Sequence, residues 1–187
     1  VGAYTLVAGT MLHAGKLWNW FLHTALGASF FMTLFCLLQL SGEMVINQGA
    51  VRVDGTLGNA TYLAVYMLFN VFLLAFFAFT RRAHIKELFL TYGIGAILFI
   101  LFYVDRVAST EFESASVGIW LTVISFFIIG GIVYLWSLGN KKEFPVYLRP
   151  LLYLPLIGVE AFVLIKTATR GAILGLGVGA VIVAILL

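Results

Sequence analysis

The stretch Lys166-Thr167-Ala168-Thr169-Arg170-Gly171 separates two long apolar runs, residues 151–165 and 171–187. Apolar runs of this kind are typical of helices that cross a bilayer, for which about 20 residues are needed. A guanidinium group at the membrane boundary is costly unless an anionic group accompanies it. The stretch therefore predicts a turn between two membrane helices, with Arg170 as a candidate anion-binding residue.

The composition of the whole chain is that of a membrane protein. Of its 187 residues, 63% are hydrophobic, 16% are aromatic and only 10% are charged, which lies outside the range of soluble globular domains. The formal net charge is +3, but the eleven Lys and Arg residues are scattered between apolar runs. They form no basic stripe of the kind that nucleic-acid binding requires. We therefore predict an all-α, polytopic transmembrane helix bundle with no nucleic-acid partner.

The apolar runs divide the chain into helices and connections. A window of about 19 residues predicts five full spans, at residues 17–40, 60–80, 87–104, 117–138 and 151–165, with partial spans at 1–12 and 171–187. The first residue is not an initiator Met, and the last lies inside an apolar run. We therefore expect residues 1–187 to be a fragment of one larger transmembrane domain that has further spans before Val1.

Charges in the connections predict the orientation of the bundle. One alternate set of connections holds seven basic residues, namely Lys16, Arg81, Arg82, Lys86, Lys141, Lys142 and Arg149. The opposite set holds three bases and five acids, namely Arg52, Arg106, Arg170, Glu43, Asp54, Asp105, Glu111 and Glu113. Because Lys and Arg are enriched in short cytoplasmic loops, the first side is predicted to be cytoplasmic and the second to face outward.

A second polar segment on the predicted outer side, Arg52-Val53-Asp54-Gly55-Thr56-Leu57-Gly58-Asn59, precedes the run at 60–80. Its two glycines permit tight backbone geometry. Thr56 or Asn59 is placed to cap the following helix, whose first amides would then meet an anion beside Arg52. The segment is therefore a candidate phosphate site. The alternative is an ordinary polar loop in which Asp54 neutralises Arg52.

The turn that carries Arg170 is too short to leave the membrane surface. There a guanidinium group can make bidentate contacts with phosphate oxygens. The alternative is that the side chain extends to lipid headgroups. Gly171, Gly175 and Gly179 follow at every fourth position, which predicts a smooth helix face for close packing.

Two further charged residues are secondary candidates for the site. Glu160 lies in the middle of a predicted span, where an ionisable group is a functional hypothesis by default. The alternative for Glu160 is a structural hydrogen bond to a neighbouring helix. Arg106 lies beside Asp105 at the outer end of a span, an arrangement that favours a local charge pair.

The remaining reactive side chains predict no metal and no cofactor. Three histidines lack both metal-ligand spacing and a neighbouring carboxylate cluster, namely His13, His23 and His84. Cys36 lies within an apolar run and is predicted to be a small buried hydrophobe. The sequence shows no serine or cysteine nucleophile constellation, so the catalytic residue stays unknown.

The two polar segments resemble motifs of the O-antigen ligase superfamily, which also contains O-antigen polymerases and bacterial protein O-oligosaccharyltransferases. Arg52, followed by Gly55-Thr56-Leu57-Gly58-Asn59 and Tyr62-Leu63-Ala64, is similar to the family's Arg and Gly-Thr-Phe-Gly-Asn-Pro-Asn-Tyr-Leu-Ala stretch. Thr169-Arg170-Gly171-Ala172 is similar to its Ser-Arg-Gly-Ala motif, which opens a helix. Ala60-Thr61 replaces the family's Pro-Asn, whereas Thr169 keeps the hydroxyl of the family's Ser.

The resemblance implies a membrane glycosyltransferase of the bacterial inner membrane. Such enzymes move a glycan from an undecaprenyl-diphosphate carrier to a lipid, glycan or protein acceptor at the outer face. The resemblance implies that Arg52 and Arg170, with Asn59 and Thr169, bind the donor diphosphate without a cofactor. It also implies a catalytic histidine in a large periplasmic loop beyond Leu187, so that the fragment alone would be inactive.

Two other classes of function stay open at the level of the sequence. The first is a transporter or flippase for lipid-linked oligosaccharides, which would show broken helices, deep charges and repeated halves. Glu160 is the only deep charge, and we find no internal repeat. The second is a structural membrane subunit that binds only membrane lipids, in which Arg52 and Arg170 are incidental.

Overall fold

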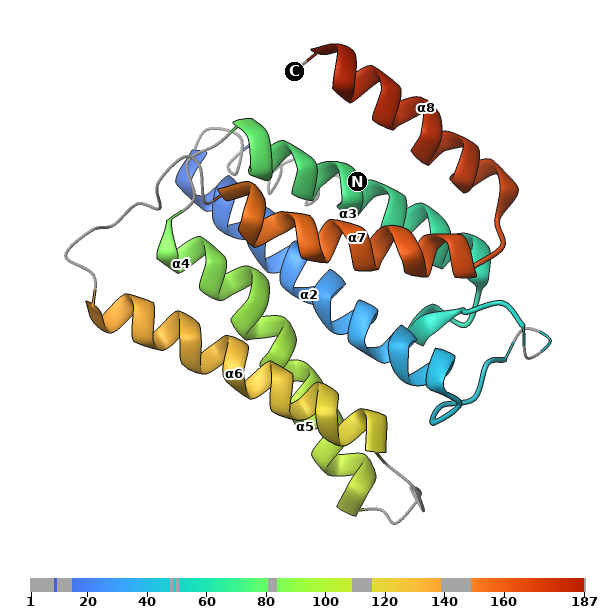
Figure 1. Cartoon of the computed structure of the whole chain (residues 1–187), viewed down its shortest axis with the longest axis horizontal. Helices are drawn as coiled ribbons and strands as arrows, with labels where there is room; N and C mark the ends of the chain where they lie inside the picture. The colour runs from blue at the N-terminus through green and yellow to red at the C-terminus, as the bar shows by residue number, and fades with distance from the viewer. Residues whose placement is uncertain are drawn as a thin grey trace.

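The computed structural model describes residues 9, 15–47, 49, 51–80, 84–108, 116–138 and 149–186. The regular elements in this part of the chain are all helical (Figure 1). The α-helices are α2 (Gly15–Ser41), α3 (Ala60–Thr80), α4 (Ile85–Leu88), α5 (Ile94–Ala108), α6 (Ser116–Leu138), α7 (Arg149–Lys166) and α8 (Arg170–Leu186). A 3-10 turn, η1 (Gly55–Leu57), precedes α3, and a π-helical segment, η2 (Phe89–Gly93), joins α4 to α5.

The long helices run side by side in alternating directions (Figure 1). α3 lies against α7, α2 packs against α5, and α8 lies along the outer side of α3. The end of α2, the start of α3 and the turn between α7 and α8 lie together at one end of the bundle. We call this end the arginine end. The end of α3 and the start of α7 lie at the opposite end, as the alternation of charged connections predicts.

The helix positions predicted from the apolar runs are confirmed to within a few residues. Four helical stretches are long and apolar enough to cross a membrane, namely Gly15–Ser41, Ala60–Phe79, Ile85–Val107 and Val117–Leu135. The predicted count of about five full spans is not confirmed. α7 carries Arg149, Glu160 and Lys166 within 18 residues, and these three charges lower its hydropathy. The predicted partial span at 1–12 lies outside the described residues except for Gly9.

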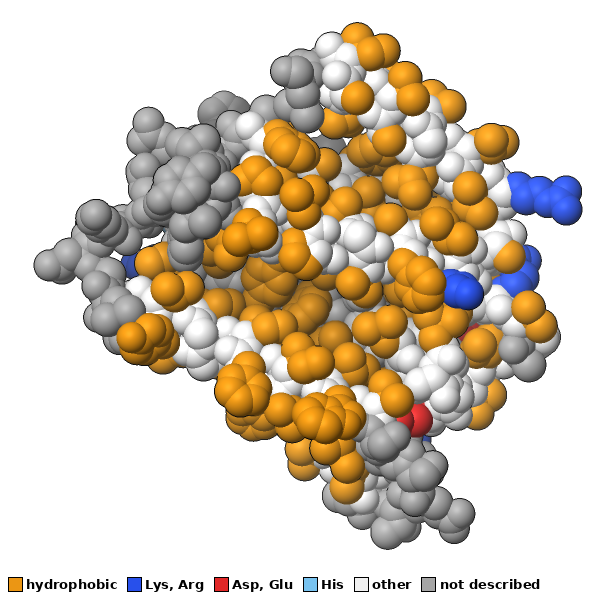
Figure 2. Space-filling model, in the orientation of Figure 1, with side chains coloured by type: hydrophobic (Ala, Val, Ile, Leu, Met, Phe, Trp, Pro, Cys, Tyr) orange, Lys and Arg blue, Asp and Glu red, His pale blue; other side chains and the backbone are white. Residues whose placement is uncertain are grey.

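The sides of the bundle are apolar, and its arginine end carries charged side chains. Figure 2 shows hydrophobic side chains over the sides of the helices and Lys and Arg side chains gathered at the arginine end. Large side chains of α6 such as Trp120, Phe126 and Phe127 are more than half exposed. An exposed apolar surface of this extent matches lipid rather than water.

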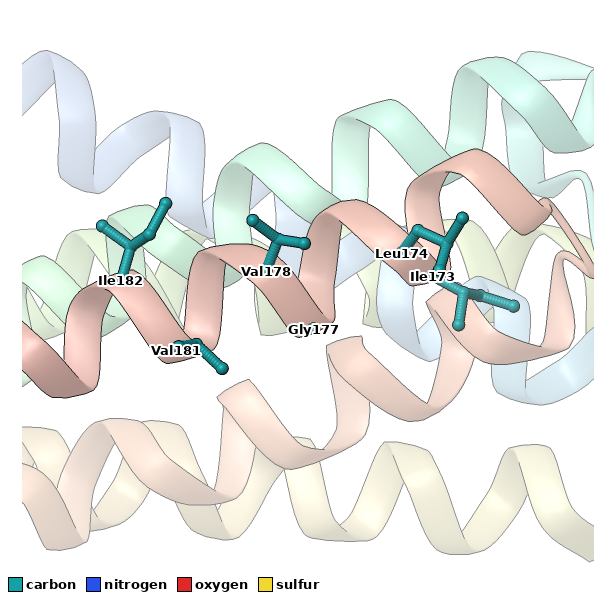
Figure 3. A pocket seen from close by; sticks show the side chains of 6 residues that line it. All are labelled: Ile173, Leu174, Gly177, Val178, Val181 and Ile182. Carbon is teal, nitrogen blue, oxygen red and sulfur yellow. The ribbon is translucent and has the colours of Figure 1, made fainter.

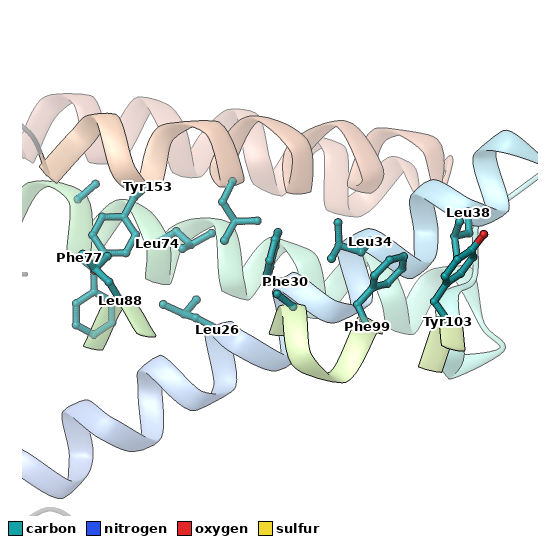
Figure 4. Close-up of a cluster of buried hydrophobic side chains, with 13 residues drawn as sticks. Leu26, Phe30, Leu34, Leu38, Leu74, Phe77, Leu88, Phe99, Tyr103 and Tyr153 are labelled. Atoms are coloured by element: carbon teal, nitrogen blue, oxygen red, sulfur yellow. The ribbon is translucent and has the colours of Figure 1, made fainter. Parts of the chain in front are cut away.

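Two hydrophobic clusters hold the helices together. The larger cluster joins α2, α3, α5 and α7 and includes the side chains labelled in Figure 4. The smaller cluster lies at the arginine end and consists of Met32, Cys36, Val53, Leu63, Ala64, Met67, Val163, Leu164 and Ala172. Cys36 is fully buried there, as predicted. This second cluster fixes the loop residue Val53 and the first turn of α8 against α2, α3 and α7.

The glycine stripe of α8 is only partly a packing face. A Cβ atom added at Gly175 would lie 3.2 Å from Cδ2 of Leu68, and one added at Gly179 would overlap the Phe72 ring. Both partners belong to α3. A Cβ added at Gly171 would meet nothing within 4 Å. The two later glycines therefore let α8 approach α3, whereas Gly171 does not serve that contact.

Candidate functional site

Arg52 joins the two polar segments at the arginine end. Its Nε donates a hydrogen bond to the Thr167 carbonyl oxygen at 2.9 Å, and its Nη2 donates to Oγ1 of Thr169 at 3.1 Å. These partners belong to the turn that immediately precedes Arg170. The segment before α3 and the segment before α8 are therefore in direct contact, although more than a hundred residues separate them in the sequence.

Asp54 does not neutralise Arg52. The Asp54 side chain is fully buried, where its Oδ1 accepts a hydrogen bond from Nε2 of Gln39 at 2.7 Å. Its Oδ2 accepts from the Asn47 amide at 3.0 Å. Within the described residues, no Asp54 oxygen lies within 4.0 Å of the Arg52 guanidinium group. The Asp54–Arg52 ion pair that the polar-loop alternative contained is therefore not present.

The tight geometry predicted for the glycines before α3 is confirmed. Gly55 and Gly58 have φ values of 58° and 64°, in the left-handed region that glycine adopts without a steric penalty. A Cβ atom at Gly55 would also lie 2.8 Å from Sδ of Met32. Oε1 of Gln39 accepts a hydrogen bond from the Gly55 amide at 2.8 Å. The same α2 side chain therefore holds both Asp54 and the backbone that follows it.

Asn59 caps α3, and this changes what the helix start can bind. Oδ1 of Asn59 accepts hydrogen bonds from the amides of Thr61 at 2.8 Å and Tyr62 at 3.4 Å. These are the amides that the sequence prediction left open for an anion, so that part of the prediction is wrong. Thr56 does not serve as the cap, because its Oγ1 lies against Sδ of Met32 at 3.5 Å.

Unlike the capped amides at the start of α3, the first amides of α8 have no side-chain cap among the described residues. In the described part of the chain, no side chain forms a hydrogen bond to the amides of Gly171 or Ala172. Arg170 is exposed, and its guanidinium group forms no hydrogen bond or ion pair with the described residues. Open amides at a helix start favour an anion. The candidate groups for binding an anion at this end are therefore the Arg170 guanidinium group, the amides of Gly171 and Ala172, and the N–H groups of Arg52 that do not take part in its two hydrogen bonds.

The backbone of this turn is held in an unusual conformation at Ala168. Its φ of 52° is the only positive φ of a non-glycine residue in the described ranges. The conformation ends α7, where the Ala168 amide donates to the Ile165 carbonyl oxygen at 3.0 Å. Left-handed backbone costs an L-residue about 1–2 kcal/mol. The turn therefore carries local strain next to the two atoms that hold Arg52.

Substitution of Ala168 tests this conformation. We expect Ala168→Val to lower the free energy of unfolding by about 1 kcal/mol or more, because a branched side chain fits poorly at positive φ. Ala168→Gly should leave stability unchanged or raise it by a few tenths of a kcal/mol, up to about 1. Thermal unfolding of both variants in one detergent provides the measurement. Equal melting temperatures for the Val and Gly variants would contradict the left-handed turn.

The two secondary candidates do not join the arginine contact. Glu160 is fully buried in α7 and accepts a hydrogen bond from Oγ of Ser29 at 2.6 Å. The guanidinium carbon of Arg106 lies 5.7 Å from the centroid of the Phe102 ring, one turn earlier on α5. The site therefore brings together Arg52, Thr169 and the backbone before Arg170, with Asn59 as a helix cap at its edge.

The structure shows one polar cluster that the sequence did not predict. Nδ1 of His23 lies 2.8 Å from Oγ1 of Thr91, and its Nε2 lies 3.7 Å from Oε2 of Glu87. Glu87 also accepts a hydrogen bond from the His84 amide at 3.2 Å and thereby caps α4. The sequence prediction concerned only the lack of a carboxylate cluster beside the histidines, and it did not include this pairing of His23 with the single carboxylate of Glu87. The sequence signal for this cluster was a histidine inside an apolar run, because a histidine that is buried there needs a polar partner.

No group of three or more His, Cys, Asp or Glu side chains in the described residues is placed to hold a metal ion. Taken together, these features define the chain as an α-helical membrane protein with a cationic site at one end of its bundle. Comparison with known proteins adds no family, because no family model, curated protein or solved structure matches the chain.

Proposed function

We propose that the arginine end binds the diphosphate group of a lipid-linked glycan, and that the native protein is an O-antigen ligase-like glycosyltransferase. The observation that carries the proposal is the hydrogen bonding of Arg52 to Thr167 and Thr169. This contact makes one site out of the two segments that resemble family motifs. It rests on geometry, whereas the glycan and the transfer reaction come from the resemblance alone.

The charges at this end support an anionic ligand. Arg170 is exposed and Arg52 is half-buried, while the neighbouring acid Asp54 is turned inward to Gln39 and Asn47. Two positive groups that have no counter-ion among the described residues favour a ligand with more than one negative charge. During transfer, negative charge grows on the leaving diphosphate, and fixed cations lower the energy of that state.

The surface of α8 supports a lipid tail on the same ligand. An apolar hollow of about 410 Å³ lies on this helix and is lined by Ile173, Leu174, Gly177, Val178, Val181 and Ile182 (Figure 3). It begins one turn after Arg170. A ligand with a charged head and a long isoprenyl chain would place its head at Arg170 and its chain along this hollow. A soluble nucleotide sugar would gain nothing from that surface.

Glycan transfer by an Arg170→Lys variant is the test. In the full-length protein, we expect transfer from an undecaprenyl-diphosphate donor to fall about 100-fold while the amount of folded protein is unchanged, because lysine keeps the charge but loses the bidentate fork. The matched control is Lys166→Ala, which removes an exposed cation from the same end; Nζ of Lys166 lies 5.3 Å from the Phe162 ring centroid. Equal transfer by the Arg170→Lys variant and the wild type would favour headgroup anchoring instead.

A further inference from the structure

Glu160 is a buried acid that the proposed site does not use. Its side chain has 0% exposure, and one carboxyl oxygen, Oε1, accepts the hydrogen bond from Ser29 at 2.6 Å. The other oxygen, Oε2, is buried and has no hydrogen-bond partner in the described structure. Buried polar atoms without a partner are rare in folded proteins and call for a ligand, an ion or a proton.

The groups around Glu160 offer no positive charge. Ser29 comes from α2, and the phenol groups near enough to interact with the carboxyl group are Tyr66 of α3 and Tyr92 of η2. The hydroxyl of Tyr92 already donates a hydrogen bond to the Leu152 carbonyl oxygen. Within the described residues no Lys, Arg or His nitrogen lies within 4.0 Å of the Glu160 carboxyl group. Its neighbours on three elements are thus neutral.

An ionised carboxylate in these surroundings is unfavourable. The free-energy cost of moving the charge out of water is larger than the stabilisation from a single hydrogen bond donated by a serine hydroxyl. The cost is greatest in the middle of a membrane protein, where a group without a counter-charge adopts its neutral form. Oε2 is the atom that a proton would occupy, because Oε1 already accepts from Ser29.

We propose that Glu160 is a proton-binding site, occupied at neutral pH by a proton taken from solvent onto Oε2. The inference rests on the burial and the partners of Glu160 and is independent of the proposed transferase function. The neutral acid keeps α7 against α2 through Ser29. Thr167, which accepts a hydrogen bond from Arg52, lies seven residues after Glu160 and directly follows the end of α7, so the charge state of Glu160 bears on the position of the arginine end.

Infrared spectroscopy of the whole protein in lipid nanodiscs tests the charge state directly. The wild type at neutral pH should show the C=O stretching band of a protonated carboxylic acid, and Glu160→Gln should lose it. The control Glu43→Gln should keep the band, since Glu43 is partly exposed and accepts hydrogen bonds from the amides of Val117 and Gly118. Ser29→Ala should shift the band to higher frequency by removing the donor to the carbonyl oxygen. A wild type whose band appears only near pH 4, about where a solvated glutamate titrates, would overturn the proposal.

Thermal unfolding as a function of pH gives a second readout. The folded state of the wild type holds one more proton than the unfolded state, so its melting temperature should fall as the pH rises from neutral to alkaline. Glu160→Gln cannot lose that proton and should show a smaller fall. Identical pH profiles for the wild type and Glu160→Gln, measured on folded samples of both, would likewise overturn the proposal.

Discussion

Substitution of Gly27 by alanine is expected to destabilise the protein by about 3 kcal/mol or more. Overpacking typically costs about 1–3 kcal/mol, and this site lies at the upper end of that range. Gly27 lies in α2 where this helix crosses η2 and α5. A Cβ atom there would overlap the Leu90 carbonyl oxygen and lie 3.3 Å from Cβ of Ile94. The opposing Gly95 makes the reciprocal contact, since its Cβ would overlap the Gly27 carbonyl oxygen. Backbone atoms cannot move aside by a change of rotamer, so the two helices would have to separate.

The control is a glycine in an equally helical but open position. Gly130 lies in α6, and a Cβ atom there would meet nothing within 4 Å. Gly130→Ala should leave the melting temperature unchanged or raise it, because alanine favours a helix by about 0.5–1 kcal/mol over glycine. Circular dichroism during heating in detergent compares the two variants. Equal melting temperatures for the Gly27→Ala and Gly130→Ala variants would show that α2 and α5 do not cross at Gly27 and Gly95.

Substitution of Asp54 by alanine is expected to cost about 2–3 kcal/mol and to disorder the segment that carries Arg52. Asp54 accepts hydrogen bonds from Gln39 and from the Asn47 amide in a fully buried position. Hydrogen bonds to a charged group contribute about 1.5–3 kcal/mol, and the abandoned donors would remain buried. Gln39 also holds the Gly55 amide, so its release loosens the turn on both sides of Asp54.

Asn47→Ala is the control for this network. The bond from residue 47 to Asp54 uses the backbone amide, and the Asn47 side chain is exposed, so this variant should match the wild type within about 0.5 kcal/mol. Hydrogen exchange at residues 51–58 should rise strongly in Asp54→Ala and hardly at all in Asn47→Ala. Protection of this segment in both variants would mean that Asp54 does not organise it.

The sequence predicted where helices lie far better than how they face one another. The run at residues 60–80 reads as one helix because its apolar stretch is bounded by Asn59, a helix-capping residue type. The same uniform apolarity hides which face of each helix packs against a neighbour. A membrane helix buried in lipid and protein has little contrast between its faces, so the pattern does not say that α3 packs on α7 or that α8 packs on α3.

The candidate site was predictable in its residues but not in its bonds. Arg52 and Arg170 stand out as charges beside apolar runs, and charge count alone places both on one side. Asp54 is the nearest acid to Arg52 in the sequence, and proximity along the chain favoured an ion pair. Its true partner is Gln39, a polar side chain within the apolar run that forms α2. Buried polar residues on that helix were the signal that sequence reasoning left unused.

The π-helical segment η2 could not be read from the sequence at all. A π turn differs from an α turn by one extra residue, and residues 89–93 carry no proline or other marker of it. Its presence is explained by its contacts. Thr91 lies against His23, and the Leu90 carbonyl oxygen lies against Gly27, so the segment is shaped by α2 rather than by its own residues.

Arg52 and its hydrogen-bond acceptors, Thr167 and Thr169, are synthesised at different times. Arg52 precedes Thr167 by 115 residues, which at a translation rate of about 5–20 residues per second is a delay of roughly 6–23 s. By then α2 is available, so Gln39 and Asp54 can already pair while the guanidinium group has none of its final acceptors. The contact can form only after Thr167 and Thr169 have been synthesised. A chain that ends before residue 167 would therefore lack both acceptors of the Arg52 guanidinium group, whereas the pairing of Gln39 with Asp54 needs only residues already made.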